Sequence, residues 1–187
     1  MPPDTTKDKF RIMLQNLLAE RFKLAIHRET KDLPTYSLVV AKTGLKMKES
    51  PESSEDQPPP TQRQTDNYGF PILPAHGSPR HMEFAMKDRA RLVGYQQTTQ
   101  DLAGHLGLLD RPVIDATGLT AKYDFTLTFS LEGLGIAPAG GGPATDVETP
   151  PDIFSAIQSQ LGLKLESKKG PIELIVIDHI EKTPTVN

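Results

Sequence analysis

The sequence predicts an α+β fold in which helices pack on one face of a mostly antiparallel sheet. The motif Thr-x-x-Asp occurs three times before an apolar helical stripe, beginning at Thr5, Thr98 and Thr149. Strand-like segments accompany each stripe, and a short helix with one hairpin cannot bury its apolar face alone. We therefore predict one domain built from three helix-plus-hairpin units, residues 5–48, 82–130 and 149–183.

The C-terminal unit has the strongest helix signals. Thr149 is predicted to cap the helix, Asp152 lies three residues later and Gly162 is predicted to end it. The apolar stripe consists of Ile153, Ile157 and Leu161. A hairpin is expected to follow, with its turn at 168–171 and its return strand at 172–180.

The first unit repeats this order. Thr5 and Asp8 are predicted to cap a helix whose apolar stripe includes Phe10, Met13, Leu14, Leu17 and Leu18. Alternating residues from Phe22 predict a strand, the segment 31–34 predicts a turn, and residues 36–40 predict the return strand.

The middle unit has short strand candidates at 82–86 and 90–94, followed by a helix capped by Thr98 with Asp101. Strict alternation over 123–130 is the clearest strand pattern in the chain. The remaining segments, 49–80 and 131–148, are rich in proline, glycine and polar residues and are predicted to be long loops. Four apolar side chains are expected to hold the first loop to the body: Tyr68, Phe70, Ile72 and Leu73.

Composition limits the function classes. The chain has 187 residues, 36% of them hydrophobic and 24% charged, as in an ordinary soluble protein. A net charge of −3 gives no basic surface for nucleic acid. The sequence has no apolar run long enough to span a bilayer. It has no cysteine either, which excludes disulfides.

The predicted strands of the first and last units contain candidate catalytic residues: His27, Asp178 and His179. His27 is predicted to be a surface histidine, because no partner that would make it a general base is evident. Asp178 shares a strand face with apolar neighbours, so we expect it to be buried and tied to a loop or to a basic side chain such as Arg111. A catalytic alternative would use His27, Asp178 or His179 together in one pocket.

The central region offers weaker candidates. His76 and His81 could contribute to a zinc site, but third and fourth ligands are not evident. His105 has no obvious partner, and Asp115 with Thr117 is typical of an Asx turn. The sequence has neither a phosphate-binding loop nor a serine-hydrolase motif. We therefore assign no catalytic, cofactor-binding or metal-binding residue and expect no cofactor.

Three ordered blocks carry a family resemblance: LLAERFKLAIHRETKDLPTYSLVVAKTGLKMK, RPVIDATGLTAKYDFTLTF and IQSQLGLKLESKKGPIELIVIDHIEKTPTVN. They resemble a soil-associated family of uncharacterised proteins that is expanded in acidobacteria. The family has no established catalytic residues, and its members typically begin with an export signal, which points to the periplasm or outside the cell. The abrupt start at Met1-Pro2-Pro3 suggests that such a segment has been removed here. The helix-hairpin units also look like small N-terminal domains of secretins and TonB-dependent receptors.

These observations favour a non-enzymatic, exported binding module of the cell envelope. An edge strand or a groove would receive a peptide, a glycan or an envelope protein. One alternative is a hydrolase-like enzyme using His27, Asp178 or His179. Another is a sensory domain that regulates an attached partner.

Overall fold

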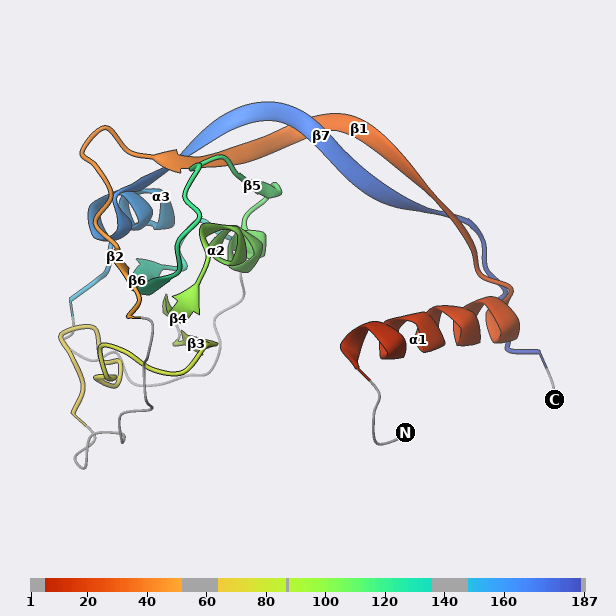
Figure 1. Ribbon diagram of the computed structural model, residues 1–187, viewed down its shortest axis with the longest axis horizontal. Helices are drawn as coiled ribbons and strands as arrows, with labels where there is room; N and C mark the ends of the chain where they lie inside the picture. The colour runs from red at the N-terminus through yellow and green to blue at the C-terminus, as the bar shows by residue number, and fades with distance from the viewer. Residues whose placement is uncertain (1–5, 52–63, 87, 136–147, 186–187) are drawn as a thin grey trace. The chain divides into compact units, whose positions relative to one another are not determined.

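The computed structural model describes residues 6–51, 64–86, 88–135 and 148–185 (Figure 1). The chain divides into two compact units: unit 1 comprises Met1–Leu33 with Gly170–Asn187, and unit 2 comprises Pro34–Lys169. Helices occur together with one mixed and one antiparallel sheet, which confirms the α+β class. The predicted repeat of three helix-plus-hairpin units is not shown. That these parts form one domain stays a prediction.

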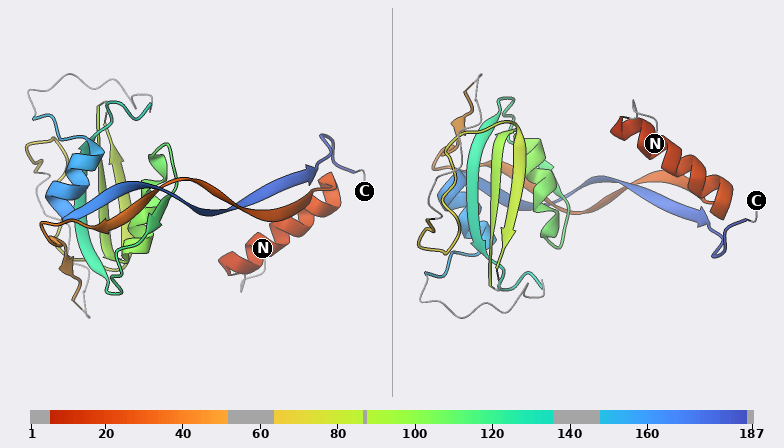
Figure 2. Two further views of the ribbon diagram at one scale, coloured as in Figure 1. Left: turned by 90° about the horizontal axis from the view of Figure 1, so that it is seen from above. Right: turned by 90° about the horizontal axis from the view of Figure 1, so that it is seen from below.

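Unit 2 contains a four-stranded antiparallel sheet whose strands lie side by side in both views of Figure 2. Its order is β2 (Lys48–Glu49), β6 (Tyr123–Ser130), β4 (Arg89–Gln97) and β3 (Arg80–Ala85). The strands predicted at 82–86, 90–94 and 123–130 are thus confirmed, with their ends moved by a few residues. On β6 the apolar residues Phe125, Leu127 and Phe129 alternate with polar ones and are all buried, as the pattern predicts.

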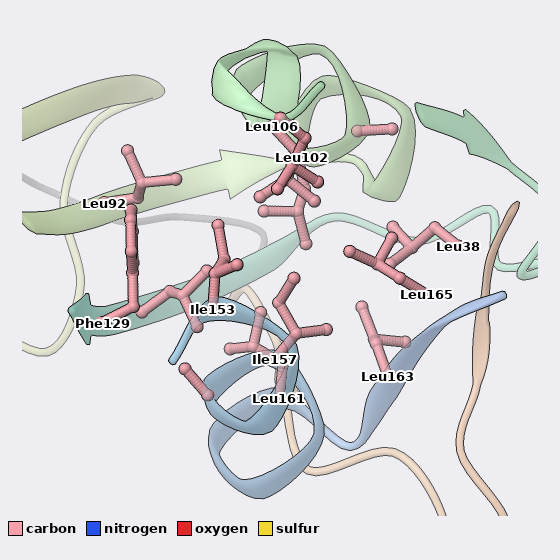
Figure 3. Close-up of a cluster of buried hydrophobic side chains, with 14 of the residues drawn as sticks. Leu38, Leu92, Leu102, Leu106, Phe129, Ile153, Ile157, Leu161, Leu163 and Leu165 are labelled. Carbon is pink, nitrogen blue, oxygen red and sulfur yellow. The ribbon is translucent and has the colours of Figure 1, made fainter. Parts of the chain in front are cut away.

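The core of unit 2 lies where two helices meet this sheet. Helix α2 (Thr99–His105) continues into a 3₁₀ turn at Leu106–Leu108, and α3 (Ile153–Ala156) continues into a π-helical turn at Ile157–Leu161. Figure 3 shows their side chains in one cluster with residues of β4 and β6 and of the ends of β1 and β7. The labelled members are Leu38, Leu92, Leu102, Leu106, Phe129, Ile153, Ile157, Leu161, Leu163 and Leu165.

The mixed sheet has the order β5 (Val113–Asp115), β1 (Ala25–Val40) and β7 (Leu163–His179). β1 and β5 are parallel, with Tyr36 opposite Val113. The turns predicted at 31–34 and 168–171 are wrong, because β1 and β7 run through them as continuous strands. Pro34 precedes the stretch paired with β5, and Pro171 lies in an edge strand, so neither proline removes a hydrogen bond from the interior of a sheet.

Unit 1 contains helix α1 (Lys7–Phe22). The C-terminal segment of the chain donates hydrogen bonds to the last backbone carbonyls of this helix. The backbone amides of Glu181 and Thr185 donate to the carbonyls of Phe22 and Arg21, both at 2.7 Å. Those carbonyls have no partner within the helix, so the tail completes its last turn. None of the described helices is both long enough and apolar enough to cross a membrane.

The three predicted helix caps have different outcomes. Thr98 and Asp101 form the predicted capping box, each side chain accepting from the other's backbone amide. In α1 the cap is Thr6 rather than Thr5, whose structure lies outside the described residues. In α3 the cap is Asp152 rather than Thr149, because two prolines separate them and a residue before proline disfavours helical angles.

The described part of the first long loop is held by its aromatic residue, as predicted. Phe70 is fully buried, and the guanidinium carbon of Arg91 lies 4.6 Å from the centre of its ring. Asp66 accepts from the backbone amides of Tyr68 and Phe70 and binds Arg91. Ile72, by contrast, is half exposed. Most of the remaining predicted loop sequence, 52–63 and 136–147, lies outside the described residues.

Candidate functional site

The most extensive unusual feature of unit 1 is apolar side chains that face solvent. Helix α1 carries a stripe of four residues with helical spacing, each between 43% and 51% exposed: Phe10, Met13, Leu14 and Leu17. Ile175 and Ile177 of β7 are 60% and 58% exposed, and Ile26 of β1 is 40% exposed. We call these seven residues the unit 1 apolar surface. In the predicted return strand at 172–180, the face that carries Ile175 and Ile177 is therefore not covered.

The strands of unit 1 also have open edges. β1 pairs with β5 only at Tyr36, Ser37 and Leu38, which belong to unit 2. Within the described residues of unit 1, β1 and β7 thus form a two-stranded ribbon. Such a ribbon presents unpaired N–H and C=O groups along its outer edges, which can accept another strand.

His27 and Asp178 meet at the end of this ribbon. His27 Nδ1 lies 2.8 and 3.0 Å from the two carboxylate oxygens of Asp178. Their side chains are 54% and 45% exposed, which confirms His27 as a surface histidine. It also corrects the expected burial of Asp178: this part of β7 belongs to a two-stranded ribbon, and solvent reaches the carboxylate.

The other partners predicted around this pair lie elsewhere. Arg111 donates to Asp110 at 3.1 Å and to Ser167 at 3.0 Å, and does not bind Asp178 as expected. His179 lies 4.0 Å from Glu181 and takes no part in the His27 contact. The structure therefore brings together two of the three residues named for a catalytic alternative, on an exposed strand pair.

In unit 2, the two histidines considered for zinc have different partners. His76 Nδ1 lies 2.6 Å from Asp124 Oδ2, and the Asp124 side chain is only 6% exposed. Asp124 also accepts from the Ser50 hydroxyl and the Gln96 amide, so it joins three segments around the sheet. This arrangement explains His76 as the partner of a buried carboxylate.

His81 instead belongs to a cluster with Glu83 and His105. His81 Nε2 lies 3.0 Å from Glu83 Oε1, and the rings of His81 and His105 stack with centroids 3.5 Å apart. One ligand atom from each of the three residues lies within 4.8 Å of the others. Alternation along a strand could have paired His81 with Glu83 in the sequence, but the contact with His105 depends on how α2 packs.

The electrostatics of this cluster centre on His105. Burial, followed by the neighbouring His81, lowers the pKa of His105, against the opposing effect of the carboxylates of Glu83 and Asp101. The pKa of Asp101 is itself lowered by hydrogen bonds from the Thr98 hydroxyl and the Thr98 backbone amide. A neutral imidazole beside two carboxylates is thereby favoured at this end of α2.

Asp115 has the structural role that the sequence predicts. The amide of Thr117 donates to Asp115 Oδ1 at 2.9 Å, which is the expected Asx turn. The hydroxyl of the buried Thr99 donates to Asp115 Oδ2 at 2.7 Å, and this contact ties the turn to α2. Asp115 is thus explained by the packing of β5 and α2.

The fold and these sites describe an α+β protein with an apolar surface on unit 1 and a histidine-carboxylate cluster on unit 2. Residues 1–180 match the model of a family described as a protein of unknown function, DUF3738, and the chain belongs to this family. No curated protein and no solved structure matches the chain. The match supports neither the soil-bacterial association nor the likeness to secretins and TonB-dependent receptors.

Proposed function

We propose that this protein is a non-enzymatic, exported binding module that uses the unit 1 apolar surface to hold a protein partner. The observation that carries the proposal is the exposed stripe of α1, formed by Phe10, Met13, Leu14 and Leu17. Contiguous apolar patches on soluble proteins commonly mark interaction sites. A helix with an exposed stripe at this spacing is a usual contact element for a groove or a second helix.

The chemistry of the surface favours a protein over a glycan. Its members are aliphatic or sulfur-containing apart from Phe10, and they offer no hydrogen bonds to sugar hydroxyls. Burying those hydroxyls without partners would be unfavourable. The open edges of β1 and β7 add backbone groups that a partner strand can pair with. Export to the periplasm or outside the cell is part of the proposal, and fractionation of cells expressing the full gene tests it.

To test the proposal, a photo-crosslinking amino acid replaces Leu17 in cells that produce this protein, and the protein crosslinked to it is identified. The partner is then purified and its Kd for the chain is measured. We expect the double variant Leu14→Ser/Leu17→Ser to weaken binding at least about tenfold, as loss of two buried leucines implies. The matched control Gln15→Ser/Asn16→Ser lies on the same helix outside the stripe and should leave Kd unchanged.

Equal binding by both double variants would contradict the proposal, as would a Leu17 probe that gives no discrete adduct. An adduct between two copies of the chain, with sedimentation showing a dimer that only Leu14→Ser/Leu17→Ser dissociates, would identify the partner as a second copy. Circular dichroism of each variant checks that α1 remains helical.

A hydrolase-like activity is the second candidate function, and the contact between His27 and Asp178 favours it. A carboxylate can orient an imidazole that acts as a general base. In the described chain the hydrogen bonds of the His27 ring go to Asp178 alone, and both side chains are about half exposed. Hydrolysis of model esters that is lost in His27→Gln but kept in His179→Gln would support this candidate over the binding module.

A further inference from the structure

The cluster on unit 2 has the ligand types of a metal centre. We propose that His81, Glu83 and His105 bind one zinc ion through two imidazole nitrogens and one carboxylate oxygen. Zinc sites with three protein ligands of these types keep a further position open for water or substrate. The proposal concerns unit 2 and does not depend on the function proposed for unit 1.

The fold holds the three residues in place before any ion binds. His81 and Glu83 are two residues apart on β3, so their side chains share one face of the strand. Pairing with β4 fixes that strand, with His81 opposite Gly94. His105 is the last residue of α2, which is anchored by the fully buried Leu102.

The distances are close to those that zinc requires. Zinc bonds to nitrogen and oxygen are about 2.0–2.2 Å long, which places the ligand atoms of a tetrahedral site about 3.3 Å apart. His81 Nε2 and Glu83 Oε1 already lie 3.0 Å apart. The other ligand atoms lie within 4.8 Å, so they need to close by at most about 1.5 Å (4.8 − 3.3). The two rings lie face to face, so binding of one ion requires rotation about their side-chain torsions to turn both nitrogens toward it.

The charges around the cluster suit a cation. Glu83 contributes a carboxylate to the cluster, and the carboxylate-bearing Asp101 lies one helical turn before His105. The positive charge of Arg80 lies on the opposite face of β3, where its guanidinium carbon is 5.3 Å from the centre of the Tyr95 ring.

The donor set favours zinc over calcium, magnesium and copper(I). Calcium and magnesium prefer sites made of oxygen ligands, whereas two of these three donors are imidazole nitrogens. The chain contains no cysteine, so the thiolate ligands that select copper(I) are absent from the sequence. Cobalt(II) occupies zinc sites of this kind and reports its coordination through visible absorption.

The experiment titrates ZnCl₂ into the tag-free full chain after EDTA treatment and dialysis, by isothermal titration calorimetry. We expect one zinc per chain. The variants His81→Ala, Glu83→Gln and His105→Ala should each weaken binding by at least roughly a hundredfold, because losing even an outer-shell partner costs 10–100-fold. Two controls, His76→Ala and His27→Ala, each remove a histidine paired with another carboxylate and should bind zinc as the wild type does.

The absence of zinc binding in the wild type would overturn the proposal, as would equal losses in the control variants. Cobalt(II) supplies the second readout, because four or five ligands give far stronger visible bands than the six-coordinate aqueous ion. Those bands should appear with the wild type and vanish with His105→Ala, whose circular dichroism confirms that it folds. A spectrum of the aqueous ion with the wild type would also refute the site.

Discussion

Replacing Gly162 by alanine tests how closely the end of the π-helical turn after α3 packs against the segment that follows β1. Gly162 has φ +68°, and a Cβ at this position would lie 2.1 Å from the carbonyl oxygen of Gly44 and 2.7 Å from the amide nitrogen of Lys46. The amide of Lys46 donates to Leu161 O at 3.0 Å, and the amide of Ala41 donates to Gly162 O at 2.9 Å. An added methyl group would therefore push two hydrogen-bonded backbone segments apart.

The expected loss of unfolding free energy can be worked out from these contacts. A left-handed conformation costs an L-residue about 1 kcal/mol. Losing the two backbone hydrogen bonds adds about 2 kcal/mol, at about 1 kcal/mol each. We expect Gly162→Ala to cost about 3 kcal/mol by this reasoning. The control Gly118→Ala has φ +71° and no atom within 4 Å of the added Cβ, so it should cost only about 1 kcal/mol.

Urea denaturation followed by tyrosine fluorescence measures the difference. The chain has four tyrosines and no tryptophan. All the tyrosines lie within Pro34–Lys169, so the signal reports unit 2. A difference between the two variants below about 0.5 kcal/mol, the usual scale of a neutral surface substitution, would refute the reasoning. It would mean that the segment containing Gly44 and Lys46 moves away without cost.

Three further predictions concern polar groups of unit 2. Asp66→Ala removes the carboxylate partner of the buried Arg91 and should lower the free energy of unfolding in urea by about 3 kcal/mol. Asp110→Ala removes the partner of the more exposed Arg111 and should lower it by less than about 0.5 kcal/mol. Equal losses would contradict the importance of burial. The lowered folded pKa of Asp101 gives stability that is present above its unfolded pKa of about 3.9 and is lost as pH falls through the folded value. The stability advantage of the wild type over Asp101→Asn should therefore shrink as pH falls below about 4, and a gap that stays constant on acidification would disprove the linkage. The side-chain amide of Gln160 accepts a hydrogen bond of 2.9 Å from the backbone of Thr128 in β6 and donates one of 2.7 Å to it. Gln160→Ala should therefore lower the free energy of unfolding by about 1–3 kcal/mol and speed hydrogen exchange of the β6 amides. Unchanged hydrogen exchange would argue against this role.

The sequence predicted correctly those features whose contacts join residues close together in the chain. The capping box of Thr98 and Asp101 closes within one helical turn, and the alternation of β6 places Phe125, Leu127 and Phe129 together in the core. Both were predicted correctly. The Asx turn at Asp115 also depends only on its near neighbours, so turn chemistry identified it.

The sequence was misleading where distant segments meet. Pro34 and the Gly170-Pro171 pair are ordinary turn signals. Both segments are nevertheless strands, because β1 and β7, which lie far apart in the sequence, pair with each other. The same non-local packing brings His105 to His81 and Asp178 to His27. No periodicity within either partner carries that information, so the histidine cluster could not be predicted from the sequence.

The tail that completes α1 has a practical consequence for designing shortened forms of this protein. The family match ends at residue 180, which makes that position an obvious place to stop a recombinant version. Such a version would lack Glu181 and Thr185 and would leave the helix carbonyls of Phe22 and Arg21 to water. A recombinant form that keeps the chain through residue 185 preserves both hydrogen bonds to the end of α1. In a shorter form the N-terminal helix would be less stable than in the longer chain, and measurements on it would not describe the native helix.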